Sequence, residues 1–145
     1  MSAITRSRVL AVAPQHLWRT VSDPKTLPQW WPGVERVEGV KSHGFTQVLR
    51  SERGAVVRAD YLRTQSVEPE LIVWTQQVEG TPFASVFAAR AVRITLEPAG
   101  TGDTQLTLTV EQTLRGAARY APLNRGGVRR QLTAALDALD ALARG

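Results

Sequence analysis

The sequence predicts an α+β fold in which a seven-stranded, curved antiparallel sheet wraps around one long C-terminal helix, with two short helices between the first and second strands. Two patterns support this prediction. Most of the chain alternates apolar and polar residues as half-buried strands do, and the short connections are typical of antiparallel neighbours. The C-terminal segment instead repeats its leucines at helical spacing. A curved sheet cannot cover its own concave face, so we expect the helix to fill it.

The first strand is expected at residues 4–12, which are rich in isoleucine, valine and threonine. Turns that contain glycine or proline separate the later segments, for example at residues 80–82 and 98–103. The six further strands are expected at residues 34–42, 45–51, 55–67, 71–78, 85–97 and 104–114.

Two short helices are expected between the first two strands. Pro14 stands where the first turn of a helix tolerates proline. Asp23 precedes Pro24 and is the expected N-cap of the second short helix. The apolar face of the first helix consists of Leu17, Trp18 and Val21.

The long helix is expected from about residue 122 to the C-terminus. Gly126 and Gly127 should weaken its start, by about 1 kcal/mol each relative to alanine. The stripe that should face the sheet consists of Val128, Leu132, Ala135, Leu136, Leu139 and Leu142.

Composition limits the class of protein. A chain of 145 residues, 43% of them apolar, predicts one domain over residues 1–145 with a core of its own. It has no cysteine and only two histidines, so we expect no disulfide, metal or cofactor. It shows no signal-peptide pattern and no apolar run of about 18 residues, so we expect a cytoplasmic protein without a membrane span.

The net charge of +5 could indicate a nucleic-acid or anionic-lipid partner. The basic residues are scattered, however, and no nucleic-acid-binding motif is visible, so we expect no nucleic-acid partner. The exception is a cluster near the start of the long helix, which could be a basic rim for an anionic ligand or a solvated helix face. An exposed edge strand would be compatible with a monomer or a homodimer. The cluster consists of Arg125, Arg129 and Arg130.

Residues 11–40, AVAPQHLWRTVSDPKTLPQWWPGVERVEGV, run from a strand end through both short helices to Pro32-Gly33 and a new strand. This opening resembles that of the SRPBCC superfamily, the START-like helix-grip domains that include polyketide cyclase/dehydrase and lipid-transport proteins. The resemblance extends over the whole chain. It implies a helix-grip fold whose internal cavity binds a hydrophobic small molecule that is lipid-like, aromatic or polyketide-like. Trp30 matches a tryptophan often found in that opening, Trp31 could roof the cavity, and the junction at Tyr120 would border its mouth.

Strand alternation indicates which side chains face this cavity. In the strand 85–97 the mostly apolar series is expected inward, which places Arg90 inside, and in 55–67 the series with Tyr61 and Arg63 is the better inward choice. The same argument turns Trp74 and Gln76 inward. Each arginine could instead reach solvent or pair with Asp60, Glu79 or Glu111, and Tyr61 could be core filler. The inward series of 85–97 is Val86, Ala88, Arg90, Val92, Ile94 and Leu96, and that of 55–67 is Val57, Ala59, Tyr61, Arg63, Gln65 and Val67.

In the last strand, the inward series is Leu106, Leu108, Val110, Gln112 and Leu114. The loop at residues 80–83 and the segment before the long helix are candidate gates to the cavity. The candidate cavity residues are Trp31, Tyr61, Arg63, Trp74, Gln76, Arg90, Leu108, Gln112, Tyr120 and Leu132.

The sequence contains no strong catalytic motif, since it has no phosphate-binding glycine loop, nucleophile elbow or HExxH. The first functional hypothesis is therefore binding of a hydrophobic small molecule in the cavity. The second is a polyketide aromatase/cyclase in which arginine and tyrosine groups polarise carbonyl oxygens. The third is a protein-interaction module, which a cavity filled by side chains would favour.

Overall fold

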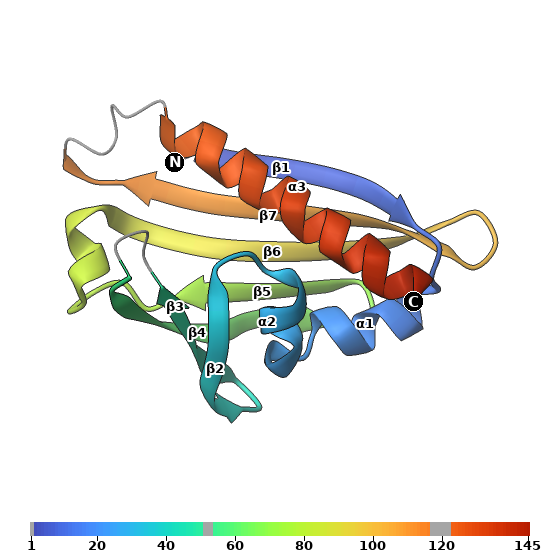
Figure 1. Cartoon of the computed structure of the whole chain (residues 1–145), viewed down its shortest axis with the longest axis horizontal. Helices are drawn as coiled ribbons and strands as arrows, with labels where there is room; N and C mark the ends of the chain where they lie inside the picture. The colour runs from blue at the N-terminus through green and yellow to red at the C-terminus, as the bar shows by residue number, and fades with distance from the viewer. Residues whose placement is uncertain (1, 51–53, 117–122) are drawn as a thin grey trace.

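A computed structural model describes residues 2–50, 54–116 and 123–145. The order of elements is the one expected: strand, short helices, six strands, long helix (Figure 1). A further 3-10 helix, η2, lies in the loop before the sixth strand, and only its last residue, Ser85, was expected in that strand. The elements are β1 (Ser2–Leu10), α1 (Pro14–Val21), η1 (Pro24–Thr26), α2 (Leu27–Trp30), β2 (Val34–Lys41), β3 (Gly44–Arg50), β4 (Val56–Val67), β5 (Leu71–Gln76), η2 (Pro82–Ser85), β6 (Phe87–Ala99), β7 (Asp103–Leu114) and α3 (Leu123–Arg144).

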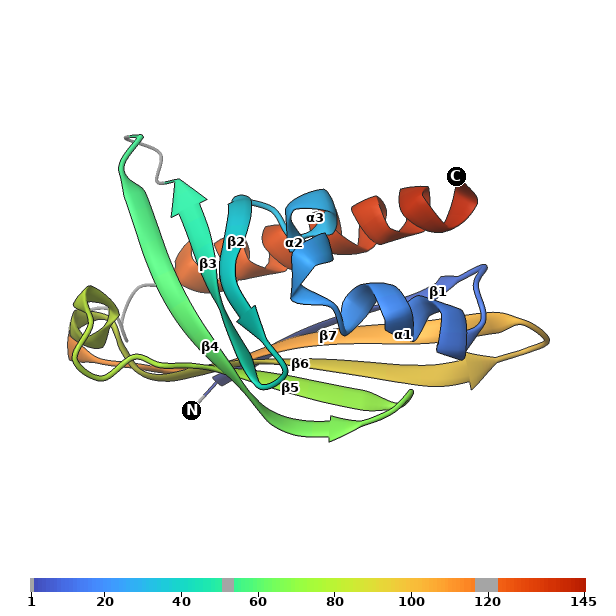
Figure 2. The ribbon, with the colours of Figure 1, turned by 90° about the horizontal axis from the view of Figure 1, so that it is seen from below.

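The seven strands form one antiparallel sheet in the order β1-β7-β6-β5-β4-β3-β2. From β2 to β7 each strand pairs with the next in sequence, as short connections require. The segment that contains α1 and α2 carries the chain from one edge strand, β1, to the other, β2. Figure 2 shows β2, β3 and β4 curving up from the plane of the other strands toward α3, which runs along the concave side.

The core lies between α3 and the concave face of the sheet. Five residues of the expected helix stripe are buried there against inward residues of β7, which are also buried. Leu142 is 44% exposed, so the expectation that it faces the sheet was wrong. It lies at the margin of the stripe in the last turn of α3, where solvent reaches it. Among the described residues, no helix is long and apolar enough to cross a membrane. The buried stripe consists of Val128, Leu132, Ala135, Leu136 and Leu139.

The short helices are anchored by local hydrogen bonds and by tryptophan packing. The Asp23 carboxylate accepts a hydrogen bond from the Lys25 backbone N–H at 3.0 Å, which confirms the expected N-cap. The indole Nε1 of Trp30 donates to Thr26 Oγ1 at 3.0 Å. Trp30 also meets Trp31 edge-to-face, with ring centroids 5.7 Å apart. These contacts hold Trp31 between the sheet and α3.

Two β-bulges change which side chains face inward. In β6, Ala88 is an extra residue between the pairs Phe87–Leu114 and Ala89–Thr113. Because each bulge reverses the alternation, Phe87 faces the interior while Val86 and Ala88 are exposed, contrary to expectation.

The second bulge is at Thr64 in β4, between the pairs Arg63–Trp74 and Gln65–Val73. The strand β3 pairs no further along β4 than Leu62, so the end of β4 is open on both faces. The expectation that Gln65 and Val67 face inward was therefore wrong, since they lie beyond the bulge and are exposed. Arg63 precedes the bulge and pairs with the inward residue Trp74, so it keeps the face of Tyr61, but it is exposed because β3 no longer covers this end of β4.

Candidate ligand-binding site

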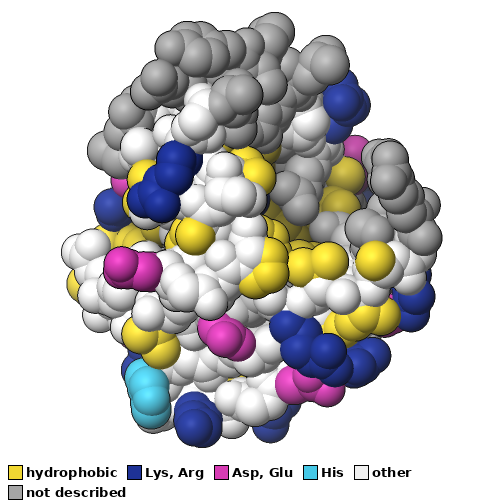
Figure 3. All heavy atoms as spheres, turned by 90° about the vertical axis from the view of Figure 1, so that its left-hand side faces the viewer, with side chains coloured by type: hydrophobic (Ala, Val, Ile, Leu, Met, Phe, Trp, Pro, Cys, Tyr) yellow, Lys and Arg dark blue, Asp and Glu magenta, His cyan; other side chains and the backbone are white. Residues whose placement is uncertain are grey.

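A cavity of about 670 Å³ lies between the concave face of the sheet and the first turns of α3. Figure 3 views the molecule from the left-hand side of Figure 1, where α3 begins, and shows a hollow with hydrophobic side chains inside it. Trp31 and Pro32 form part of its wall, and the Gln131 side-chain amide on α3 donates to the Pro32 carbonyl at 3.3 Å. A volume of this size is in the usual range for a small-molecule site.

A row of polar side chains crosses the sheet side of this cavity. Tyr61 on β4 is paired with Gln76 on β5, and Arg90 on β6 is paired with Gln112 on β7. Gln47 on β3 lies at the end of the row. Side chains on one face of paired strands are neighbours, so five strands contribute to one polar surface. Four of the five residues are buried: Gln47, Tyr61, Gln76 and Gln112.

Hydrogen bonds connect three members of this row. Nη1 of Arg90 donates to the Tyr61 hydroxyl at 2.9 Å, and that hydroxyl donates in turn to Oε1 of Gln76 at 3.5 Å. The guanidinium carbon of Arg90 also lies 5.7 Å from the centroid of the Phe87 ring, within the range of a cation–π contact. The half-buried Arg90 is thus held by neutral groups.

Arg90 forms no ion pair within the described part of the chain, so the expected alternative of a carboxylate partner was wrong. Asp60 accepts a hydrogen bond from the Thr46 hydroxyl at 2.6 Å, on the exposed side of the sheet. Glu111 pairs with Arg93 at 2.8 Å. The positive charge of Arg90 is therefore available to a ligand oxygen.

Two residues of the cavity wall have buried side-chain atoms without a hydrogen-bond partner among the residues that the structure describes: Nε2 of Gln76 and both amide atoms of Gln112. These residues are only 4% and 1% exposed. A buried polar atom without a partner costs about 1–3 kcal/mol, so such groups are uncommon in the interior of a protein. Their position marks the part of the wall where a ligand could form hydrogen bonds.

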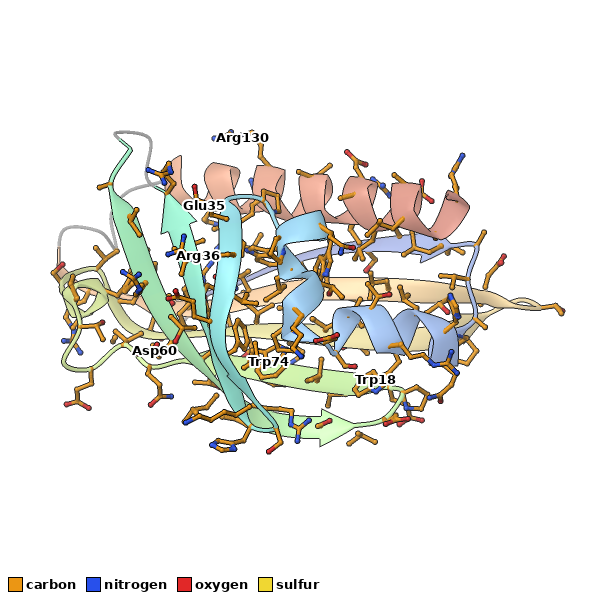
Figure 4. All side chains as sticks on the ribbon, turned by 60° about the horizontal axis from the view of Figure 1, so that its bottom comes forward. Trp18, Glu35, Arg36, Asp60, Trp74 and Arg130 are labelled. Atoms are coloured by element: carbon orange, nitrogen blue, oxygen red, sulfur yellow. The ribbon has the colours of Figure 1, made fainter. Side chains whose placement is uncertain are left out.

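Aromatic side chains close the space behind the polar row. The ring of Tyr61 stacks on Phe45 with centroids 5.4 Å apart, and Phe45 meets Trp74 edge-to-face at 4.9 Å. Trp74, labelled in Figure 4, borders a second space of only about 20 Å³, which Trp31 and Tyr61 also border. This slot is too small for a ligand, so the main cavity is the candidate site.

Residues 1–144 match the model of a protein family described as polyketide cyclase / dehydrase and lipid transport. The chain belongs to this family. No curated protein matches it.

Solved structures give the same fold for the chain. A START superfamily protein from Mycobacterium smegmatis has a TM-score of 0.79 at 15% sequence identity, over 98% of this chain and 97% of that one. The ZhuI aromatase/cyclase from Streptomyces sp. R1128 has a TM-score of 0.74 at 18% identity, over 99% and 93%. A conserved protein from Geobacillus kaustophilus has a TM-score of 0.78 at 19% identity, over 99% and 95%. The predicted START-like helix-grip fold is therefore confirmed.

In this member of the polyketide cyclase and lipid-transport family, the ten candidate residues have different positions. Trp74 borders the small slot, and Leu108 and Leu132 are packed in the core away from the cavity. Arg63 is exposed beyond the end of β3, for the reason given above. Tyr120 lies outside the described residues. The main cavity is bordered by Trp31, Tyr61, Gln76, Arg90 and Gln112.

Sequence reasoning missed several residues of the cavity wall, among them Phe87 and Gln47. Phe87 is absent from the inward series expected for residues 85–97, because nothing in the sequence indicates the bulge at Ala88. Gln47 could have been found, since alternation places it on one face of β3 with Phe45 and Leu49, where it is the polar residue between two apolar ones. Phe83, in the expected gate loop, and Arg130, in the expected basic rim, also border the cavity.

Proposed function

We propose that this protein binds, in the main cavity, a small molecule with an apolar body and a polar end. The observation that carries the proposal is the polar row on the sheet side of an open cavity of about 670 Å³. The rest of the wall is largely apolar and includes Leu49, Phe83, Phe87 and Val128. Ligand sites commonly have this composition: apolar walls supply burial and a few placed polar groups set the orientation.

Native mass spectrometry of the purified protein, followed by denaturing extraction, tests this proposal directly. We expect a retained lipid-like, aromatic or polyketide-like molecule, or else binding from a panel of such compounds. Ala134→Trp would place an indole into the cavity from α3, and it should reduce binding at least tenfold. Ala141→Trp makes the same change on an exposed turn away from the cavity and is the matched control. Equal binding by both variants would exclude the cavity as the site.

A second candidate function, ring closure of a polyketide, is favoured by the bond between Arg90 and Tyr61. A cation and a hydroxyl beside each other could stabilise the negative charge that develops on a carbonyl oxygen when its neighbouring carbon attacks. This chain also has the fold of an aromatase/cyclase.

Conversion of a reactive poly-β-ketone, followed by mass spectrometry of the ring products, tests the second candidate. Arg90→Met should lower turnover by about a hundredfold, whereas Arg63→Met, which changes an exposed arginine, should have no effect. Unchanged turnover in Arg90→Met would exclude this role. The cavity is open, so it does not provide the support for a protein-interaction module that a filled cavity would have given.

A further inference from the structure

We propose that Gln112 and Gln76 form a head-group site for a neutral ligand whose polar end carries a hydrogen-bond donor directly beside a carbonyl oxygen, as a lactam or imide does. This inference depends on the proposed function, because it names the chemical class of the molecule that enters the same cavity. It rests on the three buried amide atoms that have no partner in the part of the chain that the structure describes.

The neighbours of Gln112 do not satisfy its amide. Its partner across the sheet, Arg90, directs Nη1 to the Tyr61 hydroxyl. On the other side, Gln112 is paired with Ser2 of the edge strand β1. Both amide atoms are therefore buried without a partner among the described residues, in a side chain that belongs to the cavity wall. A primary amide presents its acceptor and donors side by side, so it pairs best with an adjacent donor and acceptor.

The charge state of the head group follows from the same atoms. A carboxylate beside Arg90 would be ionised and would have only acceptor atoms, so it would leave Oε1 of Gln112 without a donor. A lactam edge supplies both: its N–H donates to Gln112 Oε1 and its carbonyl oxygen accepts from Gln112 Nε2. Nε2 of Gln76 is then available to a second oxygen of the ligand, such as the other carbonyl of an imide.

The orientation of the ligand follows from the next residues along each strand. The next side chain on the same face of each strand, two residues earlier in sequence, is Trp74 for Gln76 and Val110 for Gln112. Neither Trp74 nor Val110 borders the main cavity. The polar row is thus the inner end of the cavity. The head group lies there, and the apolar body extends toward Phe83 and Phe87.

The experiment compares three compounds of one shape by NMR titration of the ¹⁵N-labelled full chain. The lactam 6(5H)-phenanthridinone has the donor beside the carbonyl, its N-methyl derivative lacks the donor, and phenanthridine lacks both. We expect the lactam to bind about tenfold more tightly than its N-methyl derivative and to shift the side-chain amide signal of Gln112. In Gln112→Met this preference should fall to less than about twofold. Gln105→Met makes the same substitution on the exposed face of β7 and should keep the preference.

Equal affinity for all three compounds, with loss of all binding in Ala134→Trp, would overturn the head-group inference and leave the proposed function standing. A preference for the lactam that survives in Gln112→Met would also overturn it. Failure of all three compounds to bind the unmodified chain would also overturn the inference. The proposed function is then tested separately by native mass spectrometry for a retained molecule. Thermal unfolding of each variant verifies that it is folded.

Discussion

The hydroxyl of Tyr61 on β4 accepts a hydrogen bond from Nη1 of Arg90 on β6, across the intervening strand β5, at 2.9 Å. The two residues are 29 positions apart in sequence. The bond ties a half-buried cation to a neutral oxygen at the wall of the cavity, and it brings Gln76 on β5 into the same chain of hydrogen bonds. The polar part of the site is therefore a product of strand pairing.

Tyr61→Phe should lower the free energy of unfolding by about 1.5–3 kcal/mol, because it removes the hydrogen bond from the charged Arg90 and the one to Gln76 and keeps the ring. The stacking of this ring on Phe45 at 5.4 Å should persist. Urea unfolding followed by fluorescence measures the change. A loss of more than about 3 kcal/mol would mean that the hydroxyl supports more of the core than its two hydrogen bonds indicate.

Gln112→Met should raise the free energy of unfolding of the ligand-free protein by about 1 kcal/mol. The side chain is 1% exposed and neither amide atom has a partner among the described residues, so a thioether of similar shape removes an unpaired polar group from the interior. Chemical denaturation of this variant and of Gln105→Met provides the comparison. A destabilised Gln112→Met would indicate that the amide is well satisfied in the folded protein.

Leu132→Ala and Leu142→Ala should differ strongly although both leucines belong to the stripe expected from the sequence. Leu132 is completely buried, so its truncation should cost about 2–5 kcal/mol. Leu142 is 44% exposed, so its truncation should cost less than about 0.5 kcal/mol. Urea unfolding of both variants measures the two losses of unfolding free energy. Equal losses would contradict the position of α3 on the sheet.

Glu35→Gln should reduce stability at neutral pH and have no effect in strong acid. The hydrogen bond from Arg50 holds the pKa of the Glu35 carboxyl below its ordinary value of 4.5. A lowered pKa in the folded state means that the carboxylate stabilises the protein above pH 4.5, and that this contribution is lost as the pH falls through the lowered value.

The effect should be small and should shrink with added salt, because Glu35 lies exposed on the edge strand β2 (Figure 4). Urea unfolding at neutral pH and well below pH 4.5 measures it. Glu70→Gln is the control, since Glu70 is exposed and forms no ion pair with the other residues that the structure describes. A difference from the control that persists in acid would exclude the pair with Arg50 as its cause.

Sequence reasoning placed most elements within a few residues of their observed bounds, because their signals are local. Alternation in the last strand correctly assigned Leu106, Leu108 and Val110 to the buried face. The N-cap at Asp23 also depends only on adjacent residues. Four of the five candidate residues that border the main cavity lie on strands that keep a regular alternation at that point: Tyr61, Gln76, Arg90 and Gln112. The fifth, Trp31, follows α2 and was expected from the family resemblance. Whether any of them binds a ligand stays a prediction.

The errors have a different cause. Arg63 and Arg90 are equivalent by alternation, yet one is exposed on an open strand end and the other borders the cavity. The difference depends on where the strand β3 stops pairing with β4, which is not a property of either arginine itself. Phe87 borders the cavity because the bulge at Ala88 reverses the alternation of β6, which sequence alone does not indicate.

The sequence by itself determined the order of the elements, the helical stripe that covers the sheet and the polar identity of the residues on each inward face. These features follow from the side-chain periods of two residues in strands and 3.6 residues in helices, which can be read from the sequence. Only the tertiary structure decided that Arg90 donates to Tyr61 and that a cavity of about 670 Å³ lies beside them. It also decided that Nε2 of Gln76 and both amide atoms of Gln112 have no partner among the described residues. Register, bulges and the distance between helix and sheet set these contacts, and each depends on residues far apart in the chain.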